Sequence, residues 1–367
     1  MGFKCGIVGL PNVGKSTLFN TLSSAKAEAA NYPFCTIEPN VGMVPVPDPR
    51  LDAITKLIQP KQTVPAVVQI VDIAGLVKGA SKGEGLGNQF LGNIRECEAI
   101  LHVLRCFKND NIIHVENTVD PVRDKEIIET ELQLKDLELL ERKLERTKKM
   151  TKGGNKEATR QVEIIKKFID FVEQGNNIRN MDASPEDFAI VAELGLLTAK
   201  KVMYVCNIDE DSLPDGEGNE YVAQVREAIK NEGAGMIVIS AGFEEQVMEF
   251  EEEEEIKELL ESVGLEEPGL NVLVREAYKL LGLETYFTAG EKEVRAWTIH
   301  NGTKAPQAAG VIHTDFEKGF IRAEVMKYND LMEYGSEQAV KEAGKLGVEG
   351  KEYVVADGDI MHFRFNV

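Results

Sequence analysis

Short apolar runs alternate with amphipathic stretches along the first hundred residues of the chain and again after residue 195. The runs are rich in β-branched residues and are bounded by glycine, proline or polar residues, so each predicts a buried strand. They lie at residues 3–8, 64–71, 99–107, 201–207 and 236–241. Buried strands that alternate with helical patterns indicate an α/β fold built on a parallel sheet.

Helical periodicity replaces this pattern between about residues 121 and 194. Apolar residues recur at three- and four-residue steps over 127–144 on a charged background, which predicts a long amphipathic helix. A pair of glycines at 153–154 interrupts it, and a second apolar face covers 162–172. We therefore predict an antiparallel helical hairpin, a short coiled coil, inserted into the sheet domain, because the strand pattern resumes after it.

A third pattern begins near residue 270 and mixes two helical segments, the second at residues 307–312, with alternating apolar and polar positions. The alternation predicts strands. They lie at residues 285–288, 294–299, 320–325, 353–355 and 361–367, after a helix at 272–281. We expect a small α+β domain in this part of the chain.

The composition narrows the functional classes. The chain has 367 residues, and its 62 acidic and 42 basic residues give a net charge of −20, which argues against wholesale coating of nucleic acid. No apolar run approaches the roughly 20 residues that a membrane-spanning helix requires, and no basic-then-apolar signal segment begins the chain. Five scattered cysteines fit reduced thiols. We therefore expect a cytoplasmic protein with no membrane partner.

The turn region of the predicted hairpin departs from the acidic average. Residues 142–167 contain ten Lys or Arg and three Glu, which give a local net charge of +7. Charged positions on a helix are usually a solvated face, but a basic patch of this density also suits contact with RNA. Both interpretations stay open at this point.

A phosphate-binding loop follows the first predicted strand directly. Residues 9–16 read Gly, four residues, then Gly-Lys-Ser, and a helical run comes next. Such a loop turns backbone N–H groups toward a polyphosphate, and the following helix directs its positive end at the same anion. Lys15 can reach the β- and γ-phosphates, and Ser16 can bind Mg²⁺. The predicted phosphate-binding residues are Asn12, Val13, Gly14, Lys15, Ser16 and Thr17.

A second motif strengthens this prediction. Asp72 ends a β-branched strand and Gly75 follows it in an Asp-x-x-Gly pattern. In phosphate-loop hydrolases such an Asp orders the Mg²⁺ shell, and the Gly N–H meets the γ-phosphate. Thr36, in the loop before this strand, is placed to give Mg²⁺ a second hydroxyl. The predicted metal ligands are therefore Ser16, Thr36 and Asp72, although a helix cap is the alternative for an aspartate of this kind.

Two departures from the usual hydrolase pattern bear on activity. Leu76 stands where many relatives carry the glutamine that orients water, so water must be placed from elsewhere or hydrolysis is slow. Guanine-binding relatives read the base with Asn-Lys-x-Asp, whereas this chain has Asn207, Ile208 and, at the last place, Glu210. Ile208 can pack on a flat base and Asn207 can offer an amide. The departure favours ATP modestly and leaves GTP open.

The last predicted strand of the sheet ends in Ser240 and Ala241. We include both residues among the nucleotide-binding candidates.

Together these motifs resemble the YchF family, the Obg-like ATPases, across essentially the full length of the chain. The matching segments lie at residues 9–17, 31–40, 72–87, 109–114, 207–210, 285–288 and 313–320. The resemblance implies a P-loop NTPase fold of the TRAFAC class. It implies a nucleotide-binding domain at 1–120 and 195–275, an inserted hairpin at 121–194, and a C-terminal β-grasp (TGS) domain at 276–367.

The resemblance also implies an activity. The family prefers ATP to GTP, hydrolyses it slowly, associates with ribosomes, and has a hydrophobic residue at the place of Leu76. Its water-positioning histidine corresponds to His114, which would act with Lys15 and Gly75 as a catalytic residue. His114 follows a polar stretch after a buried strand and can handle protons, although an ordinary surface histidine is the alternative. A K⁺ ion beside Asn12 is implied as well.

Three hypotheses follow from the sequence. The first is a slow ATPase switch whose nucleotide state changes its affinity for the ribosome, through rRNA or ribosomal proteins. The second is a GTPase of the same fold. The third is an RNA or ribosome adaptor that holds a nucleotide without significant catalysis.

Overall fold

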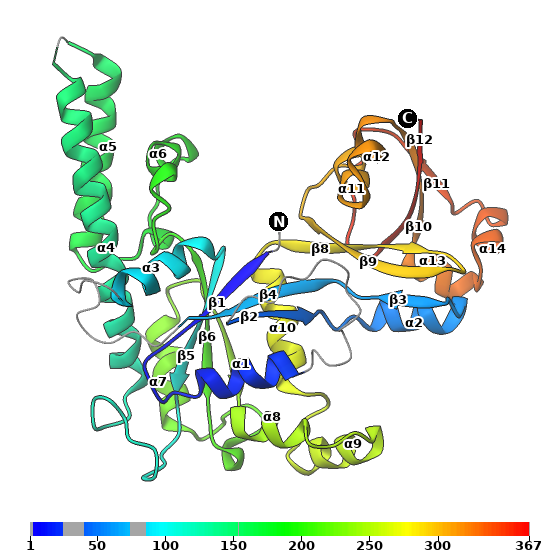
Figure 1. Ribbon diagram of the computed structural model, residues 1–367, viewed down its shortest axis with the longest axis horizontal. Helices are drawn as coiled ribbons and strands as arrows, with labels where there is room; N and C mark the ends of the chain where they lie inside the picture. The colour runs from blue at the N-terminus through cyan, green and yellow to red at the C-terminus, as the bar shows by residue number, and fades with distance from the viewer. Residues whose placement is uncertain (1–2, 25–39, 74–85, 153, 367) are drawn as a thin grey trace. The chain divides into compact units, whose positions relative to one another are not determined.

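The computed structural model describes residues 3–24, 40–73, 86–152 and 154–366 (Figure 1). The chain divides into two compact units. The first comprises Met1–Gly42 and Gln69–Leu273, and the second comprises Met43–Val68 and Val274–Val367. None of the helices in the described part of the chain combines the length and apolarity that a membrane span requires.

The first unit is built around a six-stranded sheet. From β4 through β1, β5 and β6 to β7 the neighbouring strands run parallel, and every residue of β5 is buried. Helices on both faces of a parallel sheet bury its strands completely, which is why they read as continuous apolar runs. The α/β prediction is confirmed. The strands, in sheet order, are β2 (Val41–Pro45), β4 (Val67–Asp72), β1 (Lys4–Val8), β5 (Ala99–Arg105), β6 (Lys201–Asn207) and β7 (Gly235–Ile239).

Helices alternate with these strands, as the sequence predicts, and three more follow β7. The first of them, α1, buries Leu18, Phe19 and Leu22, and Leu18 N–H donates to the Gly14 carbonyl to begin it. The helices are α1 (Lys15–Ser24), α3 (Leu86–Glu96), α6 (Pro185–Val191), α7 (Glu220–Ile229), α8 (Ala241–Val247), α9 (Glu253–Ser262) and α10 (Gly269–Leu280). Short 3₁₀ turns lie at Ile178–Asn180, Ala192–Leu194 and Glu210–Ser212.

The inserted hairpin consists of α4 (Pro121–Met150) and α5 (Lys156–Glu173), which lie side by side and are joined at one end (Figure 1). Asp120 and Asn155 cap their N-termini by accepting backbone N–H groups. The apolar faces meet in a core that contains the fully buried Leu140, Ile165 and Phe168. The periodicity therefore identified the apolar faces correctly. Most of the stability of such helices comes from the packing of these faces against each other.

The second unit contains another six-stranded sheet. β8 pairs antiparallel with β9, β10 pairs antiparallel with β12, and β12 and β8 are parallel neighbours. The predicted strands are present, except that residues 353–355 contribute only an isolated bridge at Val354. In sheet order the strands are β11 (Gly347–Glu349), β10 (Phe320–Lys327), β12 (Asp359–Phe365), β8 (Leu283–Ala289), β9 (Glu293–His300) and β3 (Gln62–Val64). The remaining helices are α2 (Pro49–Ile58), α11 (Ala305–Ile312), α12 (Thr314–Lys318), α13 (Tyr328–Tyr334) and α14 (Glu337–Glu342).

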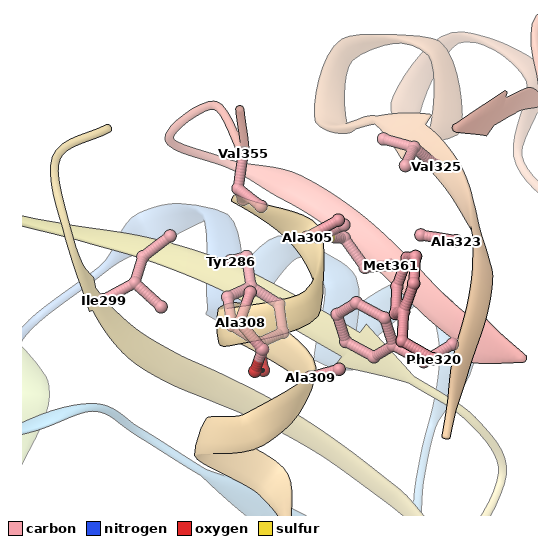
Figure 2. Packing of buried hydrophobic residues seen from close by; sticks show 11 residues of the cluster. Tyr286, Ile299, Ala305, Ala308, Ala309, Phe320, Ala323, Val325, Val355 and Met361 are labelled. Atoms are coloured by element: carbon pink, nitrogen blue, oxygen red, sulfur yellow. Dashed lines mark hydrogen bonds between the residues drawn. The ribbon is translucent and has the colours of Figure 1, made fainter. Parts of the chain in front are cut away.

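Helices cover both faces of this second sheet. Figure 2 shows the cluster that joins α11 to one face, with Tyr286, Ala308 and Met361 among its members. The neighbouring residue Phe287 points to the opposite face, where the Arg50 guanidinium of α2 lies 5.5 Å from its ring centroid. Side chains alternate between faces along a strand, so α2 and α11 lie on opposite sides.

This arrangement explains one difference from the sequence analysis, which placed residues 43–68 in the nucleotide-binding domain. The structure groups Met43–Val68 with the C-terminal residues, because α2 packs on β8 and β9 and β3 adds an edge strand beside β9. Pro65 also divides the strand expected at 64–71 into β3 and β4, since proline cannot donate to a sheet.

Candidate nucleotide-binding site

The phosphate-binding loop joins β1 to α1 and depends on a glycine near its end. Gly14 has φ = 98°, in the left-handed region that favours glycine, and Asn12 has φ = 61°. A Cβ atom on Gly14 would lie 2.1 Å from the Asn207 Nδ2 atom. Glycine is therefore required at this position for two reasons, the backbone conformation and the close approach of Asn207 at the end of β6.

Asn207, at the end of β6, joins this loop to the start of α8. Its Nδ2 atom donates to the Val13 carbonyl at 2.9 Å, and its Oδ1 atom accepts the Ala241 N–H at 2.9 Å. Both ends of the amide are therefore engaged in holding the site together. Sequence reasoning offered this amide to the base, whereas the structure uses it as a brace between the loop, β6 and the start of α8.

Lys15 and Asp72 form the charged part of the site. Lys15 is buried, and its Nζ atom donates to the Leu10 carbonyl at 2.9 Å. Burial lowers the pKa of Lys15 although Asp72 opposes the shift, and burial raises the pKa of Asp72 although Lys15 opposes it. The Asp72 Oδ1 atom is buried without a hydrogen-bond partner among the described residues. A buried acceptor of this kind is costly unless a ligand satisfies it.

A cavity of about 540 Å³ opens beside the loop. One part is polar and belongs to the loop and α1, and another part is apolar, with Phe107, Ile208 and Phe243. The predicted residues that line it are Asn12, Gly14, Lys15, Ser16, Thr17, Asn207, Ile208, Glu210, Ser240 and Ala241. A polyphosphate end beside an apolar end matches the two chemical halves of a nucleotide.

The strand ends shape the apolar part of the cavity. Ile208 is buried and its N–H donates to the Ile239 carbonyl. Ser240 caps α8 by accepting the Phe243 N–H. Glu210 keeps one oxygen 3.4 Å from the Gln246 Nε2 atom. The cavity thus presents an aliphatic side chain and a carboxylate at the place where the sequence predicts base recognition.

Family models match two parts of the chain. Residues 4–156 match a model described as "50S ribosome-binding GTPase", and residues 283–366 match "YchF-GTPase_C: Protein of unknown function (DUF933)". Proteins named "Ribosome-binding ATPase YchF" from Escherichia coli O157:H7 and Bacillus subtilis (strain 168) are 56% and 53% identical to this chain, over 100% of both lengths. The chain belongs to the YchF family.

A solved structure supports the same assignment. The "Structure of the Schizosaccharomyces pombe YchF GTPase" is 44% identical, covers 99% of this chain and 98% of its own, and superposes with a TM-score of 0.90. The predicted P-loop fold of the YchF family is therefore confirmed. The relatives differ in the nucleotide that their names mention.

His114, the histidine that the YchF resemblance singles out, lies apart from the cavity lining. It is 5% exposed, its Nε2 atom lies 2.8 Å from the Asp124 Oδ2 atom, and its Nδ1 atom accepts the Glu116 N–H. Because Nδ1 accepts, the ring proton is on Nε2 and faces Asp124. The structure brings Lys15, Asp72 and Asn207 together but leaves His114 with both ring nitrogens engaged.

Three residues to which the sequence analysis assigns a role, Thr36, Gly75 and Leu76, lie outside the residues that the structure describes. Within those residues no group of three or more His, Cys, Asp or Glu could hold a metal ion. P-loop NTPase folds generally use Mg²⁺, which binds through substrate phosphates and one or two protein oxygens rather than through an all-protein cage.

Sequence reasoning missed Arg105 and the partner of Asn12. Arg105 ends β5 and is 1% exposed. The Asn12 Nδ2 atom donates to the Ile113 carbonyl at 3.0 Å, so the phosphate-binding loop contacts the segment after β5. The available signal was a charged residue at the end of a strand whose other residues, apart from His102, are apolar.

Proposed function

We propose that this chain is an ATPase that binds the ribosome and works as a slow nucleotide-dependent switch. Relatives that match it over their full length carry the name ribosome-binding ATPase. The observation that carries the proposal is the braced loop around Gly14, with Lys15 and Asp72 beside a cavity of nucleotide size. A ribosome-binding role also makes the cytoplasm the expected location.

The loop residues have separable roles in this proposal. Backbone N–H groups of residues 12–17 bind the phosphates. The Lys15 ammonium exchanges the Leu10 carbonyl for phosphate oxygens, which are stronger partners because they are charged. Gly75 donates its N–H to the γ-phosphate.

A metal site is part of the proposal. Ser16, Thr36 and Asp72 would hold Mg²⁺, and the unsatisfied Asp72 oxygen fits this use. Mg²⁺ supplies positive charge that offsets the charge on the transferring phosphoryl group. A K⁺ ion beside the Asn12 amide oxygen is a further part of the proposal.

His114 would place the attacking water. This role requires the His114 ring to give up its bond with Asp124, because both ring nitrogens are engaged away from the cavity. Slow basal hydrolysis is the expected consequence, since each catalytic encounter needs that change first.

ATP is the proposed substrate. Ile208 offers an apolar surface to a purine, and Asn207 is committed to bracing. GTP is the second candidate, because Glu210 lines the cavity and a carboxylate can accept from the guanine N1–H and N2 amino groups. The name of the Schizosaccharomyces pombe relative also mentions GTP hydrolysis.

The tip of the hairpin is the proposed contact with the ribosome. Lys149, Lys152 and Lys156 are exposed there, and RNA phosphates attract such a cluster. A division into a nucleotide-binding domain, this hairpin and a C-terminal TGS domain belongs to the same proposal.

Nucleotide titration and phosphate release test the proposal together. Mg²⁺-ATP should displace a labelled nucleotide better than Mg²⁺-GTP, and ribosomes with K⁺ should stimulate phosphate release. Lys15→Ala should lower that release by about 100-fold or more, whereas Lys4→Ala, on the strand β1 that precedes the loop and absent from the cavity lining, should not. Better displacement by GTP would favour the GTPase, and undetectable phosphate release would favour the adaptor.

A further inference from the structure

The segment after β5 forms a wall of the nucleotide cavity. Phe107, Lys108, Asn109 and Ile112 line that cavity. The same Lys108, Asn109 and Ile112 also line a second cavity of about 460 Å³. Residues 107–113 therefore lie between two cavities. A segment in this position has few neighbouring side chains to pack against.

The side chains of this wall are not anchored in a core. None of the side chains from 107 to 113 is buried, and Ile113 is 77% exposed. A loop without buried apolar contacts normally samples many conformations, because ordering each residue costs about 1–2 kcal/mol of backbone entropy. Something other than the hydrophobic effect must hold the wall in shape.

The Arg105 guanidinium provides that support. Its Nε, Nη1 and Nη2 atoms donate to the carbonyls of Phe107, Ile112 and Asn109 at 3.2, 3.0 and 3.1 Å. It also lies 4.6 Å from the centre of the Phe107 ring. The wall is thus wrapped around a planar, multiply donating cation.

Arg105 holds this position without a direct ion pair, although the carboxylate of Asp124 is near enough to act on its charge. Its side chain is 1% exposed, and it forms no ion pair with a carboxylate among the described residues. A buried cation is costly unless its donors are satisfied, and here three main-chain carbonyls of a single segment satisfy it. A buried cation therefore fixes the backbone conformation of residues 107–113.

We propose that Arg105 is a positioning residue for nucleotide binding, which shapes the cavity wall without contacting the nucleotide. It acts through the side chains of Phe107 and Ile112, which face the cavity. Because those side chains are apolar, they would meet the base and ribose rather than the phosphates. The inference rests on the proposed function, since it assumes that a nucleotide occupies the cavity.

Arg105→Lys tests this inference, because lysine keeps the charge and most of the length but loses the planar fork. If the wall is correctly shaped about one tenth of the time in this variant, its affinity for Mg²⁺-ATP falls about tenfold. Affinity for inorganic tripolyphosphate, which needs the loop but not the wall, should change less than about twofold. Amide hydrogen exchange should accelerate in residues 107–113 and not in β1 or α1.

Arg179→Lys is the matched control. Arg179 is also nearly buried, but it bonds Glu129 and Tyr204 and does not line the cavity. It should leave ATP affinity and exchange in residues 107–113 unchanged.

The outcomes separate this inference from the proposed function. Unchanged ATP affinity or unchanged exchange of the wall in Arg105→Lys would overturn the positioning role alone. An equal loss of ATP and tripolyphosphate affinity would also overturn it, because general destabilisation would then be the cause. A wild-type chain that binds tripolyphosphate but not ATP would overturn the proposed function and this inference together.

Discussion

At the root of the helical hairpin, Lys125, Glu129 and Arg179 are nearly buried, whereas at its tip Lys149 and Lys152 are exposed to solvent. The root charges form ion pairs with each other. Lys125 pairs with Glu129 at 2.8 Å, and Arg179 pairs with Glu129 at 2.6 Å. Similar residues therefore serve structure at one end of the same hairpin and remain available to a partner at the other.

The root network ties the hairpin to the sheet. Glu232, after α7, accepts from Lys125, and the Tyr204 hydroxyl of β6 lies within hydrogen-bond distance of the Glu129 and Glu232 carboxylates, at 2.9 and 2.7 Å. Burial alone would raise the pKa of Glu129, but Lys125 and Arg179 outweigh burial and lower it. The charges of this network lie in a low-dielectric environment, where the loss of one partner leaves the others buried and uncompensated.

The tip lacks such compensation. Arg146, Lys149, Lys152, Lys156 and Arg160 form no ion pair within the described part of the hairpin, whereas Lys148 bonds Glu145 at 2.7 Å. Exposed unpaired cations contribute little to folding. Net charge alone therefore does not identify a binding surface, because burial and pairing decide which charges remain available to a partner.

Glu129→Gln should give the largest effect on stability. It leaves Lys125 and Arg179 with a single remaining carboxylate, and breaking a buried pair of this kind costs about 3–5 kcal/mol. Urea unfolding followed by far-UV circular dichroism measures the loss. Glu138→Gln is the control on the same helix, since it removes more exposed pairs with Lys135 and Arg142 and should cost about 1 kcal/mol or less. Equal costs would remove the distinction between the root and the surface.

The free energy of unfolding should also depend on pH through a histidine near the root network. Burial lowers the pKa of His102 from 6.5 to about 3. The negative charge of Glu129 opposes this shift, and the positive charges of Lys125 and Arg179 add to it. Between these values the unfolded chain binds a proton that the folded chain excludes, so stability falls as pH decreases below 6.5. The loss is about 1.4 kcal/mol per pH unit, or about 2 kcal/mol at pH 5.

His102→Phe tests this dependence, because it keeps an aromatic ring beside Tyr204 and removes the titration. The free energy of unfolding should then change less between about pH 7 and about pH 5 than in the wild type, by about 2 kcal/mol. An exposed histidine, His362, provides the control variant His362→Gln. An unaltered pH dependence in His102→Phe would show that other root groups bind the proton.

Much of the fold follows from local pattern. The loop at Gly14 could be predicted because its spacing and its strand–helix setting are sequence features. The location of α2 could not, since its apolar residues Leu51 and Ile54 fit any hydrophobic surface, and only β8 and β9, far along the chain, select one. Long-range pairing of this kind leaves no local signal.

The site divides in the same way. Lys15 and Asp72 are close in the structure, as their motifs predict. The brace at Asn207 and the support from Arg105 involve main-chain carbonyls, whose positions depend on the folded backbone. The burial of His114 was also unforeseen, because the polar stretch 108–111 precedes it and its partner Asp124 lies in the next helix.

Charge reversal at the tip should give the smallest change in stability and a clear change in binding. Lys149→Glu, Lys152→Glu and Lys156→Glu together should weaken co-sedimentation with ribosomes by about tenfold or more at moderate salt, because contacts with RNA phosphates are lost. The free energy of unfolding should change by about 0.5 kcal/mol or less, since these side chains are exposed. Nucleotide affinity should stay at the wild-type value.

A matched reversal elsewhere decides whether the tip or the total charge matters. Lys230, Lys257 and Lys279 are exposed on other helices, where each pairs with a glutamate. Their combined change to Glu alters net charge by the same amount but should leave co-sedimentation nearly unchanged. An equal loss in both triple variants would indicate a non-specific electrostatic effect. Wild-type co-sedimentation of the tip variant would instead remove the hairpin tip from the ribosome contact, and the contrast with the root would then concern stability alone.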